Sequence, residues 1–334
     1  MLRKPAVLAN DALLLLTAAI WGFAFVAQRA GMEHVGPFWF TSVRFALGSL
    51  SLVPLALLRQ RTARRAAGKT AAAGLAPAGG LAPAAGLAPA AARPPRLRVL
   101  PAGLLAGAVL FGGAALQQVG MVWTTAGKAG FITGLYVVLV PLAGLLWGER
   151  AGWARWVAAL LAAAGLFFLT VTRSLTLDRG DLLVLAGALF WTAHVRLLGW
   201  LSPRTDPVAL SCVQFAVCAL LSGAAAALSE PLALEGLLAA AIPILYGGLL
   251  SVGVAYTLQV VAQRHAPPAH AAVLLSLETV FAALGGALVL GERLPPRGLL
   301  GCALMFTGMI CSQLPLLIGA RRAARWRLVA PPRE

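Results

Sequence analysis

Long apolar segments alternate with short polar segments along almost the whole chain. Each apolar segment carries very little charge and approaches the roughly 20 residues that a helix needs to cross about 30 Å of hydrocarbon. They predict an all-α integral membrane protein with ten transmembrane helices, at residues 12–30, 38–58, 101–121, 126–147, 153–172, 181–199, 207–228, 237–262, 269–290 and 296–318. The first segment follows two basic residues, as in a signal peptide. It is too long and lacks a clear cleavage site, so we expect it to be retained.

The composition indicates a membrane protein, and the distribution of charge along the chain indicates its orientation. Of the 334 residues, 60% are hydrophobic and only 11% are charged, too few to coat a soluble globule. If the N-terminus lies inside, 20 of the 27 basic residues fall on the inner side. The positive-inside rule then predicts a multi-pass protein of the cell (plasma or inner) membrane with both termini in the cytoplasm. The net charge of +16 is explained by contact with anionic inner-leaflet lipid, and no nucleic-acid partner is expected.

The sequence also contains an internal duplication. The tripeptide Gly148–Arg150 recurs 143 residues later as Gly291–Arg293, and at an offset of 170 residues Asp11 corresponds to Asp181. Each copy would hold five helices, and because five is odd, the second copy enters the membrane from the opposite side. The chain therefore predicts two inverted five-helix repeats, a transporter design in which one central site faces either side in turn.

The two offsets differ by 27 residues (170 − 143), which indicates an insertion in the first copy. The motif GLAPA begins there at Gly74, Gly80 and Gly86, within an Ala/Gly/Pro tract. This composition cannot build a core, so we expect a disordered cytoplasmic loop without chemistry at about residues 60–98. The predicted organisation is a first repeat at residues 1–173, a second at 174–320 and a basic cytoplasmic tail at 321–334.

Four stretches carry a resemblance to a known family: LTAAIWGFAFVAQRAG (Leu16–Gly31), PFWFTSVRFALGSL (Pro37–Leu50), TTAGKAGFITGLYVVLVPL (Thr124–Leu142) and SLETVFAALGGALVLGER (Ser276–Arg293). With them the chain resembles the EamA-type family of the drug/metabolite transporter superfamily, over nearly its whole length except the GLAPA loop and the tail. The resemblance implies ten helices, a central cavity between the halves, and export or exchange of small metabolites, with no particular substrate. In one departure, Glu278-Thr279 stands where the family often has Glu-Pro, so the residue that would break the helix is missing.

Glu278 is the leading candidate for chemistry, because it lies near the middle of the ninth apolar segment. A charge at that depth costs on the order of 3 kcal/mol, so the carboxyl needs a partner or a proton. It could bind a cationic group or relay a proton, or it could fix helix packing as a protonated or paired carboxyl.

Arg44 is the second candidate, and its counterpart in the second repeat is Gln214. It could pair with Glu278, receive an anionic substrate, or extend its side chain to the outer interface. A structural or cavity-lining role is favoured over direct coupling.

The remaining candidates are polar or aromatic side chains within apolar segments: His194, Gln118, Gln259, Gln214, Trp21, Trp191, Tyr136 and Tyr256. A buried histidine can be a proton site, although a hydrogen-bonded packing role is more common. The amides could bind a solute or another helix, and the correspondence of Gln118 with Gln259 favours cavity lining. The aromatic residues could form one wall of the cavity.

The function indicated is secondary active transport of a small organic metabolite by alternating access. A channel or a non-transporting membrane scaffold is the alternative. An enzyme is not expected, because the chain lacks an HExxH motif, a GxSxG motif and an intramembrane pair of aspartates. Neither the four cysteines nor His265 and His270 form a metal-binding set, so no metal and no cofactor are expected. Proton coupling and a homo-oligomer both stay open.

Overall fold

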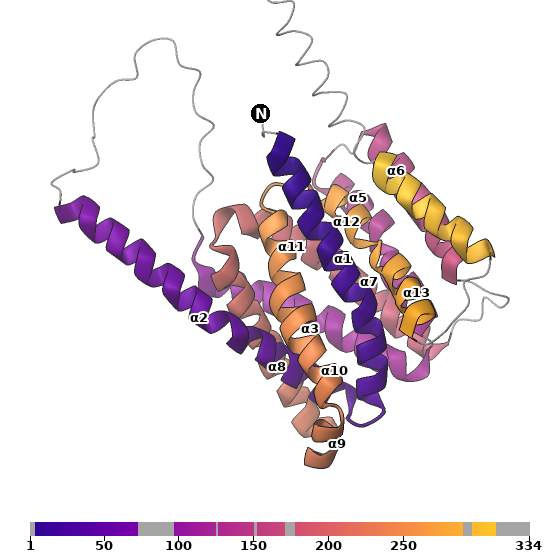
Figure 1. The fold of residues 1–334 in the computed structure, drawn as a ribbon, viewed down its shortest axis with the longest axis horizontal. Coiled ribbons are helices and arrows are strands. Elements are labelled where there is room, and N and C mark those ends of the chain that lie inside the picture. The colour runs from indigo at the N-terminus through magenta and orange to yellow at the C-terminus, as the bar shows by residue number, and fades with distance from the viewer. Residues whose placement is uncertain are drawn as a thin grey trace, which may run out of the picture.

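The computed structural model describes residues 4–72, 97–124, 126–149, 152–170, 178–289 and 296–311. Within these ranges the regular structure is helical and no strand occurs. Figure 1 shows the helices packed side by side in one bundle, from which the end of α2 projects. The GLAPA tract, the second Gly-Glu-Arg tripeptide and the basic tail lie outside the described residues.

The first half of the chain contains α1 (Lys4–Met32), α2 (Pro37–Ala72), α3 (Val99–Trp123), α4 (Ala126–Gly134), α5 (Tyr136–Leu146) and α6 (Trp153–Thr170). The second half contains α7 (Arg179–Leu201), the 3-10 turn η1 (Ser202–Arg204), α8 (Pro207–Ser229), α9 (Leu234–Ala239), α10 (Ala241–Leu245), the π-helix η2 (Tyr246–Tyr256), α11 (Thr257–Ala262), α12 (Pro268–Leu275) and α13 (Glu278–Val289). A last helix spans Pro296–Cys311.

Only some of these helices are long and apolar enough to cross a membrane. Six are long and apolar enough to cross a membrane: Leu8–Met32, Pro37–Arg59, Val99–Trp123, Arg179–Arg204, Pro207–Ser229 and Ala241–Ala262. Four shorter apolar helices accompany them: Ile132–Leu146, Trp156–Gly165, Pro268–Ala282 and Pro296–Cys311. The chain is thus an all-helical, multi-pass membrane protein, and each predicted segment contains a helix. The count of ten membrane crossings stays a prediction.

Two helices are interrupted at corresponding positions of the two sequence copies. In the first half, Leu135 separates α4 from α5, and its counterpart at an offset of 143 is Glu278, the first residue of α13. In the second half, the chain turns at Ser276 and Leu277 between α12 and α13. This break forms without the proline that the resemblance implies. Short-range hydrogen bonds make it instead, with Leu277 N bonded to Leu274 O at 3.3 Å and Thr279 N to Ser276 O at 3.2 Å.

The π-helix η2 has no counterpart in the first half. At the offset of 141 that relates Gln118 to Gln259, η2 corresponds to residues 105–115, which form part of the regular helix α3. Side chains of α1 bind two carbonyl groups of η2: Thr17 Oγ1 donates to Ala255 O at 3.1 Å and Trp21 Nε1 donates to Ser251 O at 3.2 Å. π-Helices are rare and often occur at functional sites.

The two halves of the chain pack directly against each other. The main helix pairs are α2 with α8, α3 with α7 and α8, and α1 with α13. Small residues allow the close approach: a Cβ atom on Gly107 of α3 would lie 2.6 Å from Val217 Cβ and 2.8 Å from Gln214 O of α8. The interior between the halves is therefore formed by both sequence copies.

Candidate functional site: a central cavity between the halves

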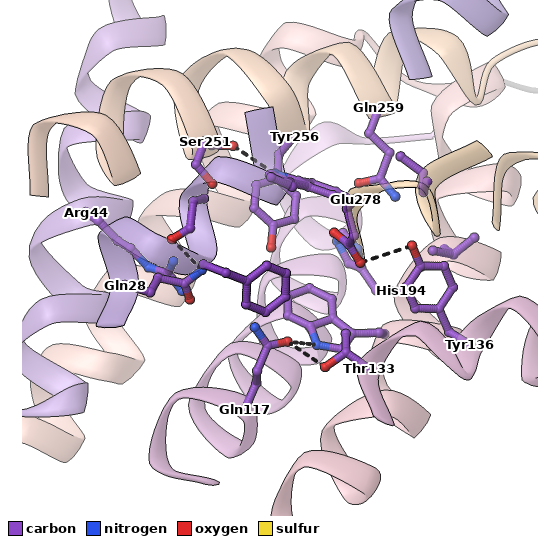
Figure 2. Close-up of a pocket in the computed structure, with 16 residues that line it drawn as sticks. Gln28, Arg44, Gln117, Thr133, Tyr136, His194, Ser251, Tyr256, Gln259 and Glu278 are labelled. Carbon is purple, nitrogen blue, oxygen red and sulfur yellow. Dashed lines mark hydrogen bonds between the residues drawn. The ribbon is translucent and has the colours of Figure 1, made fainter. Parts of the chain in front are cut away.

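A central cavity lies where the broken helices meet η2 (Figure 2). Its volume is about 550 Å³ including its mouth, but the centres of water molecules could occupy only about 50 Å³ of it. That space holds a few waters, since one water needs roughly 10–15 Å³ by this measure. Eight residues expected from the sequence line the cavity: Glu278, Arg44, His194, Gln259, Trp21, Trp191, Tyr136 and Tyr256.

Glu278 and Tyr136 form the acidic end of the cavity. The Tyr136 hydroxyl donates a hydrogen bond to Glu278 Oε1 at 3.3 Å, and the two side chains are 4% and 5% exposed, respectively. Each is the first residue after a helix break, and the two breaks come from different halves. The geometry gives Glu278 a neutral hydrogen-bond donor, and within the described ranges it has no cationic partner.

Arg44 lies at the other end of the cavity, together with Gln28 (Figure 2). The side chain does not extend to the outer interface, because Arg44 is only 4% exposed. It does not pair with Glu278 either, and it forms no ion pair with any residue that the structure describes. Its guanidinium carbon lies 5.6 Å and 5.1 Å from the ring centres of Phe40 and Phe45, and its Nε has no hydrogen-bond acceptor.

Aromatic side chains separate the two polar ends. The ring centre of Tyr256 lies 4.5 Å from that of Trp21 and 6.2 Å from that of Trp191, with which it is stacked. The two tryptophans correspond at the offset of 170 but bind differently. Trp21 Nε1 donates to the η2 backbone at Ser251, whereas Trp191 Nε1 donates to Gln117 Oε1 at 2.8 Å. The aromatic wall predicted from the sequence is present, and the two copies contribute to it asymmetrically.

The predicted amides divide between the cavity and the packing around it. Gln259 lines the cavity, whereas Gln118 and Gln214 are not among its lining residues. Gln214 Oε1 instead lies 3.0 Å from His194 Nε2, so this ring nitrogen carries the hydrogen because a carbonyl oxygen only accepts. His194 thus both lines the cavity and binds a packing amide from α8.

Four polar lining residues were missed by the sequence argument: Gln117, Thr133, Gln28 and Ser251. Gln117 was passed over for its neighbour Gln118, which matches Gln259 in the duplication. Adjacent helical residues point about 100° apart, and the orientation of α3 brings Gln117 but not Gln118 to the cavity. A signal existed for Gln28, because it lies seven residues after Trp21 and therefore on the same helix face.

Comparison with known proteins agrees with this architecture. The model of the EamA-like transporter family matches residues 9–171 and 178–313. The chain belongs to the EamA-like transporter family. An "Uncharacterized transporter" of Archaeoglobus fulgidus is 29% identical over 302 residues, which cover 90% of this chain and 84% of that protein. "Uncharacterized protein PA1977" of Pseudomonas aeruginosa is 34% identical over 264 residues, covering 77% of each chain.

A crystal structure of another protein superposes with a TM-score of 0.69 over 94% of this chain and 99% of that one. The sequence identity is 19%, so this likeness concerns the fold alone. Membership in the EamA-like transporter family supports a membrane transporter. Nothing in these comparisons specifies a substrate.

Two buried acidic side chains of this EamA-family protein occupy opposite ends of the bundle. Asp11 Oδ1 lies 2.8 Å from His270 Nε2 and links α1 to α12, near the predicted inner end. Its sequence counterpart Asp181 accepts a hydrogen bond from Thr124 Oγ1, which follows α3 at the other end. Asp11 and Asp181, which correspond in the two copies, thus form contacts at opposite ends of the bundle. His270 is engaged with a carboxylate, and no cluster of three or more metal-ligating residues occurs within the described ranges.

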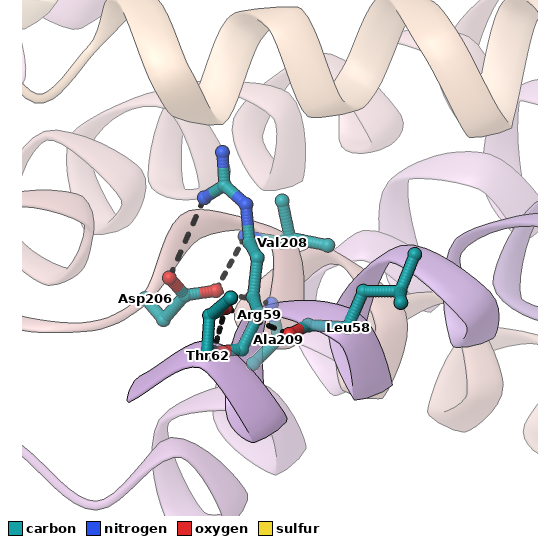
Figure 3. Close-up of polar contacts among 6 residues, drawn as sticks. All are labelled: Leu58, Arg59, Thr62, Asp206, Val208 and Ala209. Carbon is teal, nitrogen blue, oxygen red and sulfur yellow. Dashed lines mark hydrogen bonds and ion pairs between the residues drawn. The ribbon is translucent and has the colours of Figure 1, made fainter. Parts of the chain in front are cut away.

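A wider vestibule lies at the end of the bundle where α2 leaves it. The centres of water molecules could occupy about 650 Å³ there, and Arg59, Arg204, Asp206 and Arg264 are among its lining residues. Figure 3 shows Arg59 Nη1 3.6 Å from Asp206 Oδ2, while Asp206 Oδ1 accepts from the first amides of α8. This is the end that the charge distribution predicts to be cytoplasmic. The central cavity is much smaller than this vestibule.

Proposed function

We propose that this EamA-family protein is a secondary active transporter that moves a small organic metabolite by alternating access. The observation that carries the proposal is the cavity between the two halves, which contains a buried arginine and a buried glutamate that do not pair. Retaining two such groups inside a membrane protein is costly unless they bind something that passes through.

The arrangement of the helices supports alternating access over a static pore. Both halves contribute a broken helix to the cavity, and at the offset of 143 the two breaks lie within two residues of each other. Broken helices at the interface of two inverted repeats are a recurring feature of transporter binding sites. Asp11 and Asp181 form contacts at opposite ends of the bundle, and both contacts are present in this structure. Alternating access would require one of the two to open while the other stays formed.

Glu278 is the proposed site of proton coupling. It faces the cavity, it has a neutral donor in Tyr136, and within the described part of the chain no arginine, lysine or histidine contacts it. The carboxyl can therefore take up or release a proton without breaking an ion pair. The coupled solute would bind in the same cavity, so protonation and solute binding would affect each other.

The proposed setting is the plasma or inner membrane, with both termini in the cytoplasm. Arg59, Arg204 and Arg264 then lie at the inner surface, where anionic lipid would favour them. The partners of the protein are a small-molecule solute and these lipids.

A metabolite screen followed by flux measurements tests the proposal. Purified protein is screened for metabolites that raise its melting temperature, and each hit is then followed into proteoliposomes. We expect saturable uptake that is accelerated by unlabelled solute on the opposite side, because exchange requires alternating access. Flux that rises linearly with solute concentration would instead indicate a channel. A protein that moves no bound solute would indicate a scaffold.

A further inference from the structure

We propose that the end of the central cavity formed by Arg44 and Gln28 binds the negatively charged group of the solute, which is therefore a small amphipathic organic anion. This inference rests on the proposed transport function and names the class of solute for the same cavity. The subsite is the guanidinium of Arg44 with the side-chain amide of Gln28 beside it in the cavity wall.

The charge of Arg44 has no compensating anion among the residues that the structure describes. The side chain is 4% exposed, and it forms neither an ion pair nor a side-chain hydrogen bond with any residue that the structure describes. A buried arginine normally satisfies its five N–H donors with carboxylates or carbonyl groups. Arg44 lines the cavity, so a ligand in that cavity can supply the missing acceptors.

The groups packed around Arg44 hold it in place without using its donors. The rings of Phe40 and Phe45 lie 5.6 Å and 5.1 Å from the guanidinium carbon and give a cation–π attraction. On another side, Arg44 Cδ would lie 3.5 Å from a Cβ atom placed on Gly247, so the alkyl stem packs against η2. Such contacts orient a guanidinium, but hydrogen bonds to an anion remain to be made.

The two other candidate partners of Arg44 are excluded by position. Glu278 lies at the far end of the cavity, where it accepts a hydrogen bond from Tyr136 (Figure 2). Lipid headgroups are out of reach because the side chain is buried. Gln28 adds a side-chain amide at the Arg44 end, and its Nε2, which donates to Ala24 O at 3.3 Å, has a second N–H that an anion can accept.

The aromatic wall explains why the anion would be amphipathic. Trp21, Trp191 and Tyr256 line the cavity together, and the ring centre of Tyr256 lies 4.5 Å from that of Trp21 and 6.2 Å from that of Trp191. An apolar or aromatic body would pack there while its acid group reaches Arg44. The centres of water molecules can occupy only about 50 Å³ of the cavity, less than the roughly 300–1,000 Å³ of small-molecule pockets. The cavity must therefore widen to admit such a solute.

Three probes with the same apolar body and different charge test the inference: phenylacetate, phenylacetamide and 2-phenylethylamine. Binding to purified full-length protein is measured by calorimetry or by the shift in melting temperature. We expect wild type to prefer phenylacetate. Arg44→Met should weaken phenylacetate binding on the order of 10- to 100-fold, the loss typical of a charged hydrogen bond, and should leave phenylacetamide nearly unchanged. Arg44→Lys should retain part of the preference because it keeps the charge but loses the planar fork.

Arg59→Met is the matched control, because Arg59 lies in α2 as well but lines the vestibule and not the central cavity. It should leave the preference for phenylacetate intact. Arg44→Met should melt no lower than wild type, since the arginine it removes has no anionic partner to lose. If Arg44→Met does not fold, the comparison of wild type with Arg44→Lys still tests the inference. Arg44→Lys must then show a weaker preference for phenylacetate than wild type.

Any of three results overturns the inference: wild type binds none of the probes, it binds the amide or the amine as tightly as the carboxylate, or the carboxylate preference survives in Arg44→Met. Counterflow in proteoliposomes separates this failure from failure of the proposed function. Saturable exchange of a neutral or cationic solute that does not depend on Arg44 would leave transport standing and remove the anion subsite. Arg44-dependent binding of phenylacetate without flux would support the anion subsite and contradict the proposed transport function.

Discussion

Tyr136 and Glu278 join the two halves of the chain by one hydrogen bond, 3.3 Å long, at the point where a helix breaks in each half. Tyr136 begins α5 and Glu278 begins α13. A rearrangement that moves one half against the other must therefore change the surroundings of this carboxyl. The link between helix geometry and Glu278 chemistry is the basis of the first prediction.

Glu278→Gln should abolish uphill transport, because the amide keeps the shape of the side chain and its hydrogen bonding but cannot carry a proton. Glu278→Asp should retain some coupling with an altered pH dependence. The measurement is uptake driven by a pH gradient in proteoliposomes, run beside counterflow exchange. Exchange needs no net proton movement and should fall less than uphill uptake in Glu278→Gln.

Wild-type uphill rates in Glu278→Gln would remove the coupling role and leave Glu278 as a packing or solute-contact residue. A packing role has its own signature: Glu278→Gln would be nearly silent, whereas Glu278→Leu would lower the melting temperature. Tyr136→Phe is the companion variant, since it removes only the hydroxyl that binds Glu278. It should alter the pH dependence of uptake with little loss of stability.

Asp11→Ala should destabilise the protein far more than Arg59→Ala. Asp11 contacts His270 at 2.8 Å with both side chains nearly buried, whereas Arg59 and Asp206 are 3.6 Å apart and about half exposed. Breaking a buried pair by removing one partner costs about 3–5 kcal/mol, whereas an exposed pair contributes roughly 0–1 kcal/mol. The deciding measurement is the free energy of unfolding of both variants and of wild type in detergent micelles. Equal losses in the two variants would show that the Asp11 contact does not hold α1 to α12.

Gly22→Ala should impair both stability and transport. A Cβ atom on Gly22 would lie 2.5 Å from Phe281 Cβ and 2.6 Å from Glu278 O, so α1 or α13 must move and carry Glu278 with it. Overpacking of this kind costs about 1–3 kcal/mol. Gly130→Ala is the control, because the nearest atom there is Thr279 Cγ2 at 4.0 Å. The melting temperature and the exchange rate are measured for both, and similar values would contradict the tight α1–α13 contact.

The two Gly-Glu-Arg tripeptides should face opposite sides of the membrane. Single cysteines at the positions of Arg150 and Arg293, in a background without the four native cysteines, are labelled with a membrane-impermeant reagent. We expect Arg150→Cys to react from the cytoplasmic side and Arg293→Cys from the outer side, because each repeat holds an odd number of helices. Labelling of both from one side would rule out inverted repeats.

Deletion of Ala71–Ala92 should leave folding and transport nearly intact. The segment has the composition of a disordered loop, and the entropy of closing a loop changes slowly with its length, by about 0.6 kcal/mol per doubling. Expression, melting temperature and exchange are compared with wild type. A loss of insertion or of activity would assign this segment a function.

The membrane class, the helical segments, the duplication and half of the cavity lining could be predicted from the sequence. These follow from local physics. A segment of about 20 apolar residues must be helical in lipid because its backbone groups have no other partners. A charged residue inside such a segment must face the protein interior. That is why Glu278 and Arg44 could be placed in the site from their positions alone, and why the paired tryptophans were expected on its wall.

The contacts that those residues make became visible only in the folded structure, because they form between segments far apart in the chain. Whether Gln117 or Gln118 faces the cavity depends on the rotation of α3 against α7, and sequence correspondence favoured Gln118. The break before Glu278 forms through short-range hydrogen bonds without a proline. The π-helix η2 is held by α1 side chains more than 200 residues away in sequence, as the 230 residues between Trp21 and Ser251 show. The separation of Arg44 from Glu278 depends on the width of the cavity, which is set by how the two halves pack.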